Sequence, residues 1–460
     1  MRHSVGRQFA RLMTAFALAL PLLAGCNRID PPEKSKTLVI GIVAGPTTYQ
    51  DEAGVVSGFE HDLLESFAAS LGFKTRYVLL KDRHTLMEEL KKGHLHLAAG
   101  APIEAGEDLV FSLPIRESKQ VLVGNVDDTL FNDDPPDLAG RTIEVPTGSP
   151  QAMALRKLAG TPPRFTVSEV AGSADRDLLQ RVAEYKSALA ASDTLNFSLA
   201  LNYFPDLTIV MELPEHIRSG WAVTTENAAL AGKANAFILA AKKDSSLARL
   251  QDRYFGHIQR IKADGVASFI DDIRTILPHY RKTFQAAQAS TGLDWRLIAA
   301  LAYQESKWDP LATSYTNVRG MMMLTEDTAD RMHVDNRLDP MQSTLAGARY
   351  LLALKDELPD DVMEPDRTWL ALAAYNLGMG HLNGARTFAR QMKRDSTSWY
   401  DMKKVLPLMS TPEFYMRLKA GPARGGEAVI LVENIRNYYD ILCRFEAPWQ
   451  PTPKLSFNLR

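Results

Sequence analysis

One acidic residue in the second half of the chain stands where a general acid could work. Glu305 lies near the end of an uninterrupted run of helix-forming residues that begins at Leu293. The run is apolar almost all round between Leu297 and Ala302, which predicts a buried helix. Burial disfavours a charged carboxyl, and the negative end of the helix dipole does the same. Both effects raise the pKa of Glu305, as proton donation near neutral pH requires.

The helix pattern by itself leaves a second interpretation open, a solvated glutamate that happens to follow an apolar run. We expect Asp309-Pro310 to stop the helix, because the residue before a proline is disfavoured in the α region. Strand patterns are absent from Ile270 onward, so this half of the chain is predicted to be all-α. Further helices are predicted at 270–289, 341–358, 367–377 and 429–442.

Four motifs distinguish these two interpretations of Glu305. They are Glu305-Ser306, Gly320-Met321-Met322-Met323-Leu324, Ala373-Ala374-Tyr375-Asn376 and Arg424-Gly425-Gly426-Glu427. In type, order and spacing they resemble the catalytic domain of the soluble lytic transglycosylases, an all-α lysozyme-like fold. The resemblance covers about residues 270–445, and it favours a catalytic Glu305.

The resemblance implies a carbon–oxygen lyase that acts on the glycan strands of peptidoglycan. Glu305 would protonate the glycosidic oxygen after N-acetylmuramic acid, while the N-acetyl carbonyl of the sugar stabilises the cation. The same residue, now a base, would take the proton of the C6 hydroxyl, which attacks C1 and leaves a 1,6-anhydro end. Hydrolysis of a glycoside commonly uses two carboxyls, and these motifs place only Glu305.

Three residues next to or within the motifs are expected to support Glu305. By resemblance, Ser306 would hydrogen-bond near Glu305 or near the N-acetyl group of the substrate. Tyr375 and Asn376 would orient Glu305 and the sugar, with a core aromatic and its polar neighbour as the alternative. Gly378 and Gly380 are expected to end the helix that carries them.

The remaining motif residues have two interpretations each. Met321, Met322 and Met323 are expected to line the saccharide groove, although methionines also fill cores. Met323 stands where many relatives have a glutamine that binds sugar, so that contact is in doubt. Glu427 is either a second acid near the groove or the partner of Arg424 or another base in an ion pair.

The first half of the chain has a different pattern. Strands are predicted at 38–43, 75–79 and 95–99, and helices at 60–71 and 85–92. Strands that alternate with helices imply parallel α/β sheets. The segments 58–63, 111–114 and 140–149 are similar to the family-3 extracellular solute-binding proteins, and the similarity covers about residues 37–258. It implies a two-lobed, periplasmic-binding-protein-like domain.

That family closes its two lobes on a small ligand, and an arginine shortly before the Phe-Ser segment binds the ligand's carboxylate. Residues 101–110 contain no arginine here, so we expect free amino acids not to bind tightly. Asp193 and Ser149 resemble the family's contacts to the ligand's amino group and to the second lobe. A cell-wall peptide or another small ligand is the expected occupant, and an empty cleft is the alternative.

The N-terminus carries the pattern of an exported lipoprotein. Arginines 2, 7 and 11 precede an apolar segment at 12–23, and Leu23-Ala24-Gly25-Cys26 follows. The pattern predicts a signal peptide at 1–25 and acylation of Cys26, which would anchor the chain by lipid to the periplasmic face of the outer membrane of a Gram-negative bacterium. An ordinary signal with a chance cysteine is the alternative.

These observations predict a multidomain chain, in which an α/β two-lobed domain is followed by an all-α lysozyme-like domain. The expected segments are a signal peptide (1–25), a tether (26–36), a solute-binding domain (37–258), a linker (259–269), a catalytic domain (270–445) and a tail (446–460). The pairing resembles the membrane-bound lytic murein transglycosylases.

Composition excludes some other classes of function. The 55 acidic and 53 basic residues nearly cancel, so no global field points to nucleic acid. Neither Cys26 nor Cys443 has a metal ligand's spacing to a partner, and no metal or cofactor is expected. Two alternative functions remain. One is a hydrolytic muramidase in which Glu427 or Asp327 activates water, and the other is a solute receptor with an inert second half.

Overall fold

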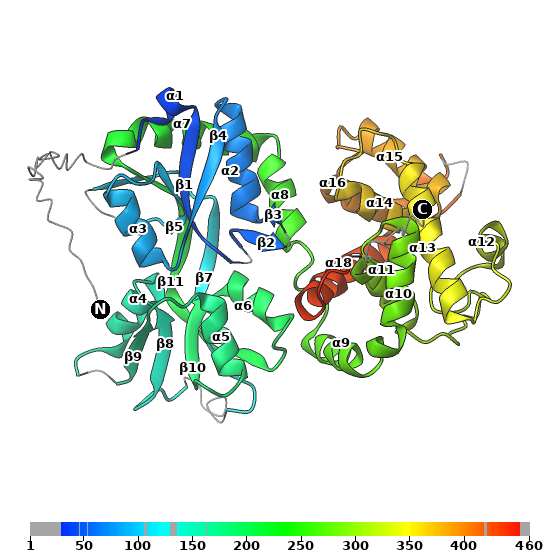
Figure 1. Cartoon of the computed structure of the whole chain (residues 1–460), viewed down its shortest axis with the longest axis horizontal. Coiled ribbons are helices and arrows are strands. Elements are labelled where there is room, and N and C mark those ends of the chain that lie inside the picture. The colour runs from blue at the N-terminus through cyan, green and yellow to red at the C-terminus, as the bar shows by residue number, and fades with distance from the viewer. Residues whose placement is uncertain are drawn as a thin grey trace, which may run out of the picture.

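The computed structural model describes residues 29–450 except 46, 53, 105–107, 129–135, 163 and 418–420. The predicted signal peptide, Cys26 and residues 451–460 lie outside this range. An α/β part comes first along the chain and a helical part follows it, as predicted (Figure 1). Among the described residues, no helix combines the length and the apolar character that a membrane span needs.

A single sheet runs through the α/β part. Within the described residues it has nine strands in the order β4-β1-β5-β11-β7-β10-β8-β9, and β6 pairs with β11. The strands β1, β4 and β5 pair in parallel, as do β8, β9 and β10, which confirms the predicted α/β class. The bounds are β1 (Thr37–Val43), β4 (Lys74–Leu80), β5 (Leu97–Pro102), β6 (Leu109–Phe111), β7 (Arg116–Asn125), β8 (Thr142–Pro146), β9 (Thr166–Val170), β10 (Leu189–Asp193) and β11 (Leu207–Thr224).

The long strands β7 and β11 divide this sheet into two lobes. They pair antiparallel from Leu207 opposite Asn125 to Ser219 opposite Arg116. Lobe one has β4, β1 and β5, and lobe two has β10, β8 and β9. Helices of lobe one are α2 (Phe59–Ser70), α3 (Arg83–Lys91), α7 (Ala228–Lys243) and α8 (Ser246–Phe255); those of lobe two are α4 (Pro150–Ala159), α5 (Asp175–Ala183) and α6 (Thr194–Leu201).

Two short elements precede or interrupt this pattern in lobe one. A one-turn helix, α1 (Pro32–Ser35), lies inside the segment that we expected to be a tether. The hairpin of β2 (Gln50–Glu52) and β3 (Val55–Ser57) projects from lobe one toward the helical part (Figure 1). Both elements are brief, and neither joins the main sheet.

The second part is helical, as predicted, and no strand longer than an isolated bridge occurs in its described residues. Its helices are α9 (Ala263–Thr275), α10 (Leu277–Thr291), α11 (Trp295–Ser306), α12 (Glu326–Arg331), α13 (Pro340–Asp356), α14 (Asp366–Leu377), α15 (Met379–Gln391), α16 (Trp399–Val405), η3 (Leu406–Ser410), α17 (Pro412–Tyr415) and α18 (Gly425–Phe445).

Several helix boundaries differ from the sequence-based expectation. The predicted helix at 270–289 is two helices, α9 and α10, which meet at Ile276, just before Pro278 in the first turn of α10. Because α9 begins at Ala263, most of the segment expected to be a linker is helical, and Phe269 within it is fully buried. Gly378 ends α14 as expected, but Gly380 lies inside α15.

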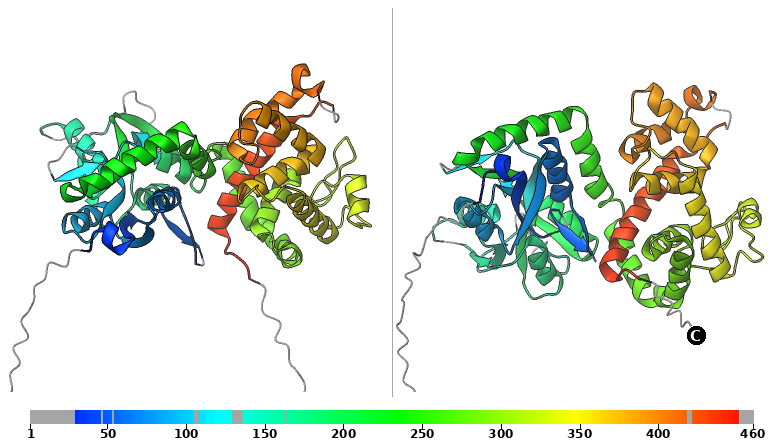
Figure 2. Two further views of the ribbon diagram at one scale, coloured as in Figure 1. Left: turned by 90° about the horizontal axis from the view of Figure 1, so that it is seen from above. Right: turned by 45° about the horizontal axis from the view of Figure 1, so that its top comes forward.

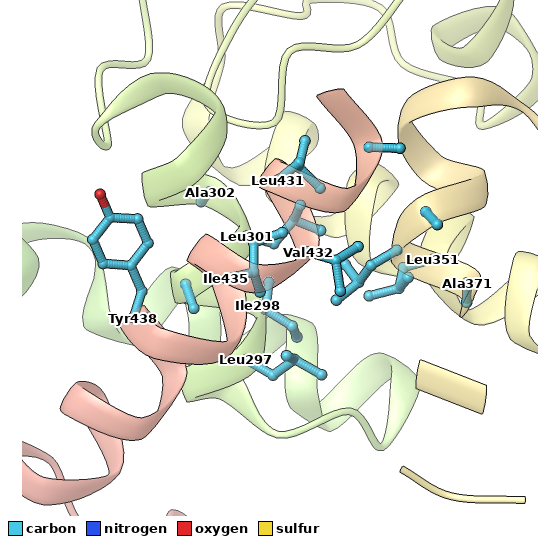
Figure 3. Packing of buried hydrophobic residues seen from close by; sticks show 14 of the residues in the cluster. Leu297, Ile298, Leu301, Ala302, Leu351, Ala371, Leu431, Val432, Ile435 and Tyr438 are labelled. Atoms are coloured by element: carbon cyan, nitrogen blue, oxygen red, sulfur yellow. The ribbon is translucent and has the colours of Figure 1, made fainter. Parts of the chain in front are cut away.

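The helix α11 lies in the centre of the helical part. Its side chains from Trp295 to Tyr303 are all buried, as the apolar run predicted. Figure 3 shows Leu297, Ile298 and Leu301 of α11 among residues of α18, with residues of α13 and α14 close by. A buried aliphatic side chain contributes about 1.5–3 kcal/mol, so this core holds α11 in a fixed position.

The two parts contact each other through charged groups. Arg296 of α11 forms an ion pair with Glu52 of β2 at 2.6 Å, and Lys403 forms one with Asp252 of α8 at 2.5 Å. His257 lies 2.6 Å from Asp440 of α18. Figure 2 shows the two parts side by side from two further directions.

Candidate active site

Glu305 is the next-to-last residue of α11. Asp294 caps the start of this helix by accepting a hydrogen bond from the backbone N–H of Arg296 at 2.8 Å. The helix ends at Ser306, three residues before the Asp309-Pro310 stop that we predicted. The cause is a left-handed turn, because Lys307 and Trp308 have φ angles of 56° and 60°.

The carboxyl of Glu305 is half-buried and has no charged or hydrogen-bonding partner among the described residues. Burial alone raises its pKa to about 8. A carboxyl with this pKa is largely protonated at neutral pH. It can therefore donate a proton there, which an exposed glutamate cannot do.

The turn Gly320–Leu324 packs against the end of α11. The hydroxyl of Ser306 donates a hydrogen bond to the carbonyl of Met321 at 2.8 Å, with the carbonyl of Ala302 also within 3.1 Å. Gly320 has a φ of 81°, and a Cβ there would lie 1.8 Å from the carbonyl oxygen of Arg337. Only glycine fits this position, so the motif's glycine is required by the backbone.

The methionines of this turn do not all face a groove, as we had expected. Met321 and Met322 are fully buried, and the side chain of Met322 packs against Gly347. Met323 is half-buried and has a left-handed φ of 46°. Met323 lines a pocket, whereas the complete burial of Met321 and Met322 shows that the core interpretation holds for those two residues and that a place in the groove was wrong.

Tyr375 joins the same turn from α14. Its hydroxyl donates a hydrogen bond to the carbonyl of Met322 at 2.9 Å. Burial raises the pKa of Tyr375 well above its ordinary value, and the carboxyl of Glu305 close by raises it further. The structure therefore brings Glu305, Ser306, Tyr375 and the Gly320–Leu324 turn together around one site.

Other predicted residues stand outside this group. Asn376 is exposed, and Glu427 is exposed and 3.6 Å from Arg424 in an ion pair, the second interpretation that we gave for it. Asp327 is exposed at the rim of the pocket that Met323 lines.

In the α/β part, the two predicted cleft residues are helix caps. Ser149 is buried and its hydroxyl accepts from the N–H of Ala152 at 3.3 Å. Asp193 is buried at the start of α6 and accepts hydrogen bonds at 2.9 and 3.1 Å from the backbone N–H groups of Leu195 and Asn196. It also accepts one from the side-chain amide of Asn196 at 2.7 Å. Both side chains are therefore occupied by the fold itself.

The sequence analysis missed two arginines, Arg83, whose charge interacts with that of Asp193, and Arg116, whose charge interacts with that of Arg83. Arg83 of α3 lines a pocket of about 270 Å³ with Glu104 and Gly148. Burial lowers the pKa of Arg83, and the charges of Asp175 and Asp193 oppose this. Two nitrogens of Arg116, Nε and Nη1, at the start of β7, are buried and have no hydrogen-bond partner among the described residues. Both lie outside the segment 101–110 in which we looked for an arginine, Arg83 at the start of α3 and Arg116 at the start of β7.

Comparisons with known proteins agree with both parts. Residues 282–398 match the family model "Transglycosylase SLT domain", and residues 38–257 match "Bacterial extracellular solute-binding proteins, family 3". An ancestral arginine-binding protein bound to arginine, a solved structure, is 24% identical with a TM-score of 0.44, over 48% of this chain and 98% of that chain.

Relatives that span the whole chain carry one name. The membrane-bound lytic murein transglycosylase F of Methylobacillus flagellatus is 41% identical, over 96% of each chain. That of Nitrosospira multiformis is also 41% identical, over 96% of this chain and 94% of the relative. The chain belongs to the membrane-bound lytic murein transglycosylase F family, with a solute-binding domain followed by a transglycosylase domain.

Proposed function

We propose that Glu305 is the general acid, and then the general base, of this peptidoglycan lytic transglycosylase. One observation carries the proposal. The Glu305 carboxyl is half-buried at the end of a rigid helix, has no described partner, and has a pKa raised to about 8. Such a group holds its proton at neutral pH and accepts one again with little cost, as a residue with both roles must.

The reaction returns Glu305 to its starting state. Glu305 gives its proton to the oxygen that joins N-acetylmuramic acid to N-acetylglucosamine, and the bond from C1 to that oxygen breaks. The N-acetyl carbonyl of the muramic acid supports the positive charge at C1. The Glu305 carboxylate then takes the proton of the C6 hydroxyl, whose oxygen bonds to C1. The products are an N-acetylglucosamine hydroxyl and a 1,6-anhydromuramic end, and no water is consumed.

Ser306 and Tyr375 hold the turn that faces Glu305, through carbonyls of Met321 and Met322. In the proposal they position the turn and the sugar, with Asn376, and Met323 contacts the saccharide. The proposed domains, 37–258 for binding and 270–445 for catalysis, enclose the two matched segments, 38–257 and 282–398.

Product analysis tests this mechanism against hydrolysis. Purified murein is digested with the protein, and the released fragments are weighed by mass spectrometry. We expect anhydromuramic ends, which are lighter by one water than reducing ends. Reducing ends would point to a hydrolytic muramidase, and no release would point to an inert second half. The structure offers the hydrolase little, since Glu427 is ion-paired and Asp327 is exposed.

We also propose that the α/β domain binds a cell-wall peptide or another small ligand and regulates catalysis. The unpartnered nitrogens of Arg116, with Arg83 close by, supply the donors for a carboxylate that residues 101–110 lack. This proposal departs from our expectation that free amino acids bind weakly, and binding measurements decide between the two. Calorimetry with free amino acids and with murein peptides, on wild type and on Arg116→Gln, tests this. Binding that Arg116→Gln leaves unchanged would contradict it.

Attachment to the outer membrane through an acylated Cys26 remains a proposal from the sequence. It predicts that a Cys26→Ala chain no longer incorporates labelled fatty acid and leaves the membrane fraction of cells. Retention of the Cys26→Ala chain in outer-membrane fractions would contradict the anchor.

A further inference from the structure

A pocket beside Tyr375 and Met323 takes no part in the proton transfers described above. It has a volume of about 370 Å³. The pocket shares Tyr375 and Met323 with the candidate active site and therefore adjoins it. It is lined by Met323, Leu324, Thr325, Asp327, Thr328, Arg331, Tyr350 and Tyr375.

The floor of this pocket is aromatic. Tyr350 of α13 contacts the ring of Tyr375, with 5.4 Å between the ring centroids and 54° between the ring planes. Both tyrosines and Met323 are half-buried. Half-buried rings with one free face are suited to pack against the apolar face of a sugar ring.

The rim of the pocket is charged. Arg331, at the end of α12, has its guanidinium 6.0 Å from the centre of the Tyr350 ring, and Asp327 stands one turn earlier on the same helix. Arg331 also forms an ion pair with Glu357 at 3.3 Å. This pair is exposed on both sides, and such pairs are weak. A carboxylate from a substrate could therefore compete for Arg331.

Murein glycan differs from plain amino-sugar chains because its muramic acid residues carry short peptides with carboxylates and a free amino group. We propose that this pocket binds a peptide-bearing sugar of the strand, and that Arg331 is the residue that selects for the peptide by binding its carboxylate. In this proposal the ring of Tyr350 packs against the sugar, and the carboxylate of Asp327 binds the amino group of the peptide. The inference rests on the proposed function and adds to it the recognition of the peptide that the muramic acid carries.

Two substrates distinguish recognition of the peptide by Arg331 from the cleavage reaction itself. One is a soluble glycan of defined length with its peptides, and the other is the same glycan after an amidase has removed them. We expect Arg331→Gln to lower kcat/KM about tenfold on the peptide-bearing glycan, mainly through KM, and less than twofold on the bare glycan. The loss should shrink as salt is added, because the contact is exposed.

Matched variants exclude a structural role. Arg349→Gln removes an exposed arginine of α13 that hydrogen-bonds to Ser290, and it should change neither rate. Arg331→Lys keeps the charge and should retain most of the selectivity. Glu357→Gln breaks the ion pair but leaves Arg331, so it should not lower the rate on the peptide-bearing glycan.

An equal effect of Arg331→Gln on both glycans, or no effect on either, would overturn the inference. So would a loss in Glu357→Gln that matches the loss in Arg331→Gln. Calorimetric binding of both glycans to the Glu305→Gln chain, with and without Arg331→Gln, measures the same selectivity without turnover. It therefore decides the inference even if the wild type releases no anhydro product, a result that would refute only the proposed function.

Discussion

Two buried acids at opposite ends of helices show how the two halves of this chain use the same chemical group. Asp193 lies at the start of α6 and accepts three hydrogen bonds from two residues. Glu305 lies at the end of α11 and accepts none from the described residues. The dipole of α6 stabilises a negative charge at Asp193, and the dipole of α11 destabilises one at Glu305.

The difference separates a structural acid from a reactive one. The side chain of Asp193 accepts three hydrogen bonds and holds the start of its helix in place. A carboxyl without donors keeps its proton and can lose it to a substrate. Burial is therefore shared by both residues, and the presence of donors distinguishes their roles.

The largest expected effect is on the rate of the reaction. Glu305→Gln keeps the size of the side chain but removes the exchangeable proton, so we expect kcat/KM on murein to fall about 10³-fold. Asp193→Asn is the matched change in the other half and should leave catalysis by the unliganded enzyme within twofold. Release of anhydro fragments, followed by chromatography, measures both. A Glu305→Gln chain that keeps most of its activity would place the acid elsewhere.

The second effect is on the pH dependence of stability. The ordinary pKa of glutamate is 4.5, and in the fold that of Glu305 is raised to about 8. Between these values the folded chain binds more protons than the unfolded chain, so stability from this group is present at low pH and is lost as pH rises toward 8. We expect the free energy of unfolding of the wild type to fall by about 1–3 kcal/mol between pH 5 and 8 relative to that of Glu305→Gln.

Denaturant unfolding of both chains at several pH values measures this slope. The quantity to compare is the difference between the unfolding free energies of the two chains at each pH, since other groups titrate equally in both chains. Parallel stability curves for wild type and Glu305→Gln would mean that Glu305 is ionised throughout this range.

The smallest effect concerns the structural acid. Asp193→Ala removes the cap of α6, and we expect it to lower the free energy of unfolding by about 1 kcal/mol. Asp193→Asn should lower the free energy of unfolding by only a few tenths of a kcal/mol, because asparagine caps helices equally well. Thermal unfolding of the three chains checks this order. Equal losses for both variants would show that the charge, and not the cap, is what α6 needs.

The sequence predicted more of the helical half than of the α/β half's cleft, for a physical reason. Glu305, Ser306 and the Gly320 turn are near each other in the chain, and the helix period and the glycine requirement make them visible. Arg83 and Arg116 are 33 positions apart in the sequence, and their charges interact only in the folded chain, which no local pattern records. The buried Met321 and Met322 were misplaced because a methionine fits a core and a groove equally well.

Helix ends were the other weak point. The predicted start of the helix at 341 is within one residue of the observed start of α13 at Pro340, where Asp339 caps the helix. The end of α11 depends instead on the left-handed Lys307 and Trp308. The indole of Trp308 is buried and donates a hydrogen bond to the carbonyl of Ala299 at 2.8 Å, a tertiary contact that holds this turn.

The central claim is that Glu305 carries a proton at the pH at which the enzyme works. Carbon-13 NMR of the glutamate carboxyls, with Glu305→Gln to assign the signal, gives the titration of this group directly. We predict a midpoint of about 8 in the free enzyme. A midpoint below pH 5 would show an ionised carboxylate and would contradict the assignment of Glu305 as the acid.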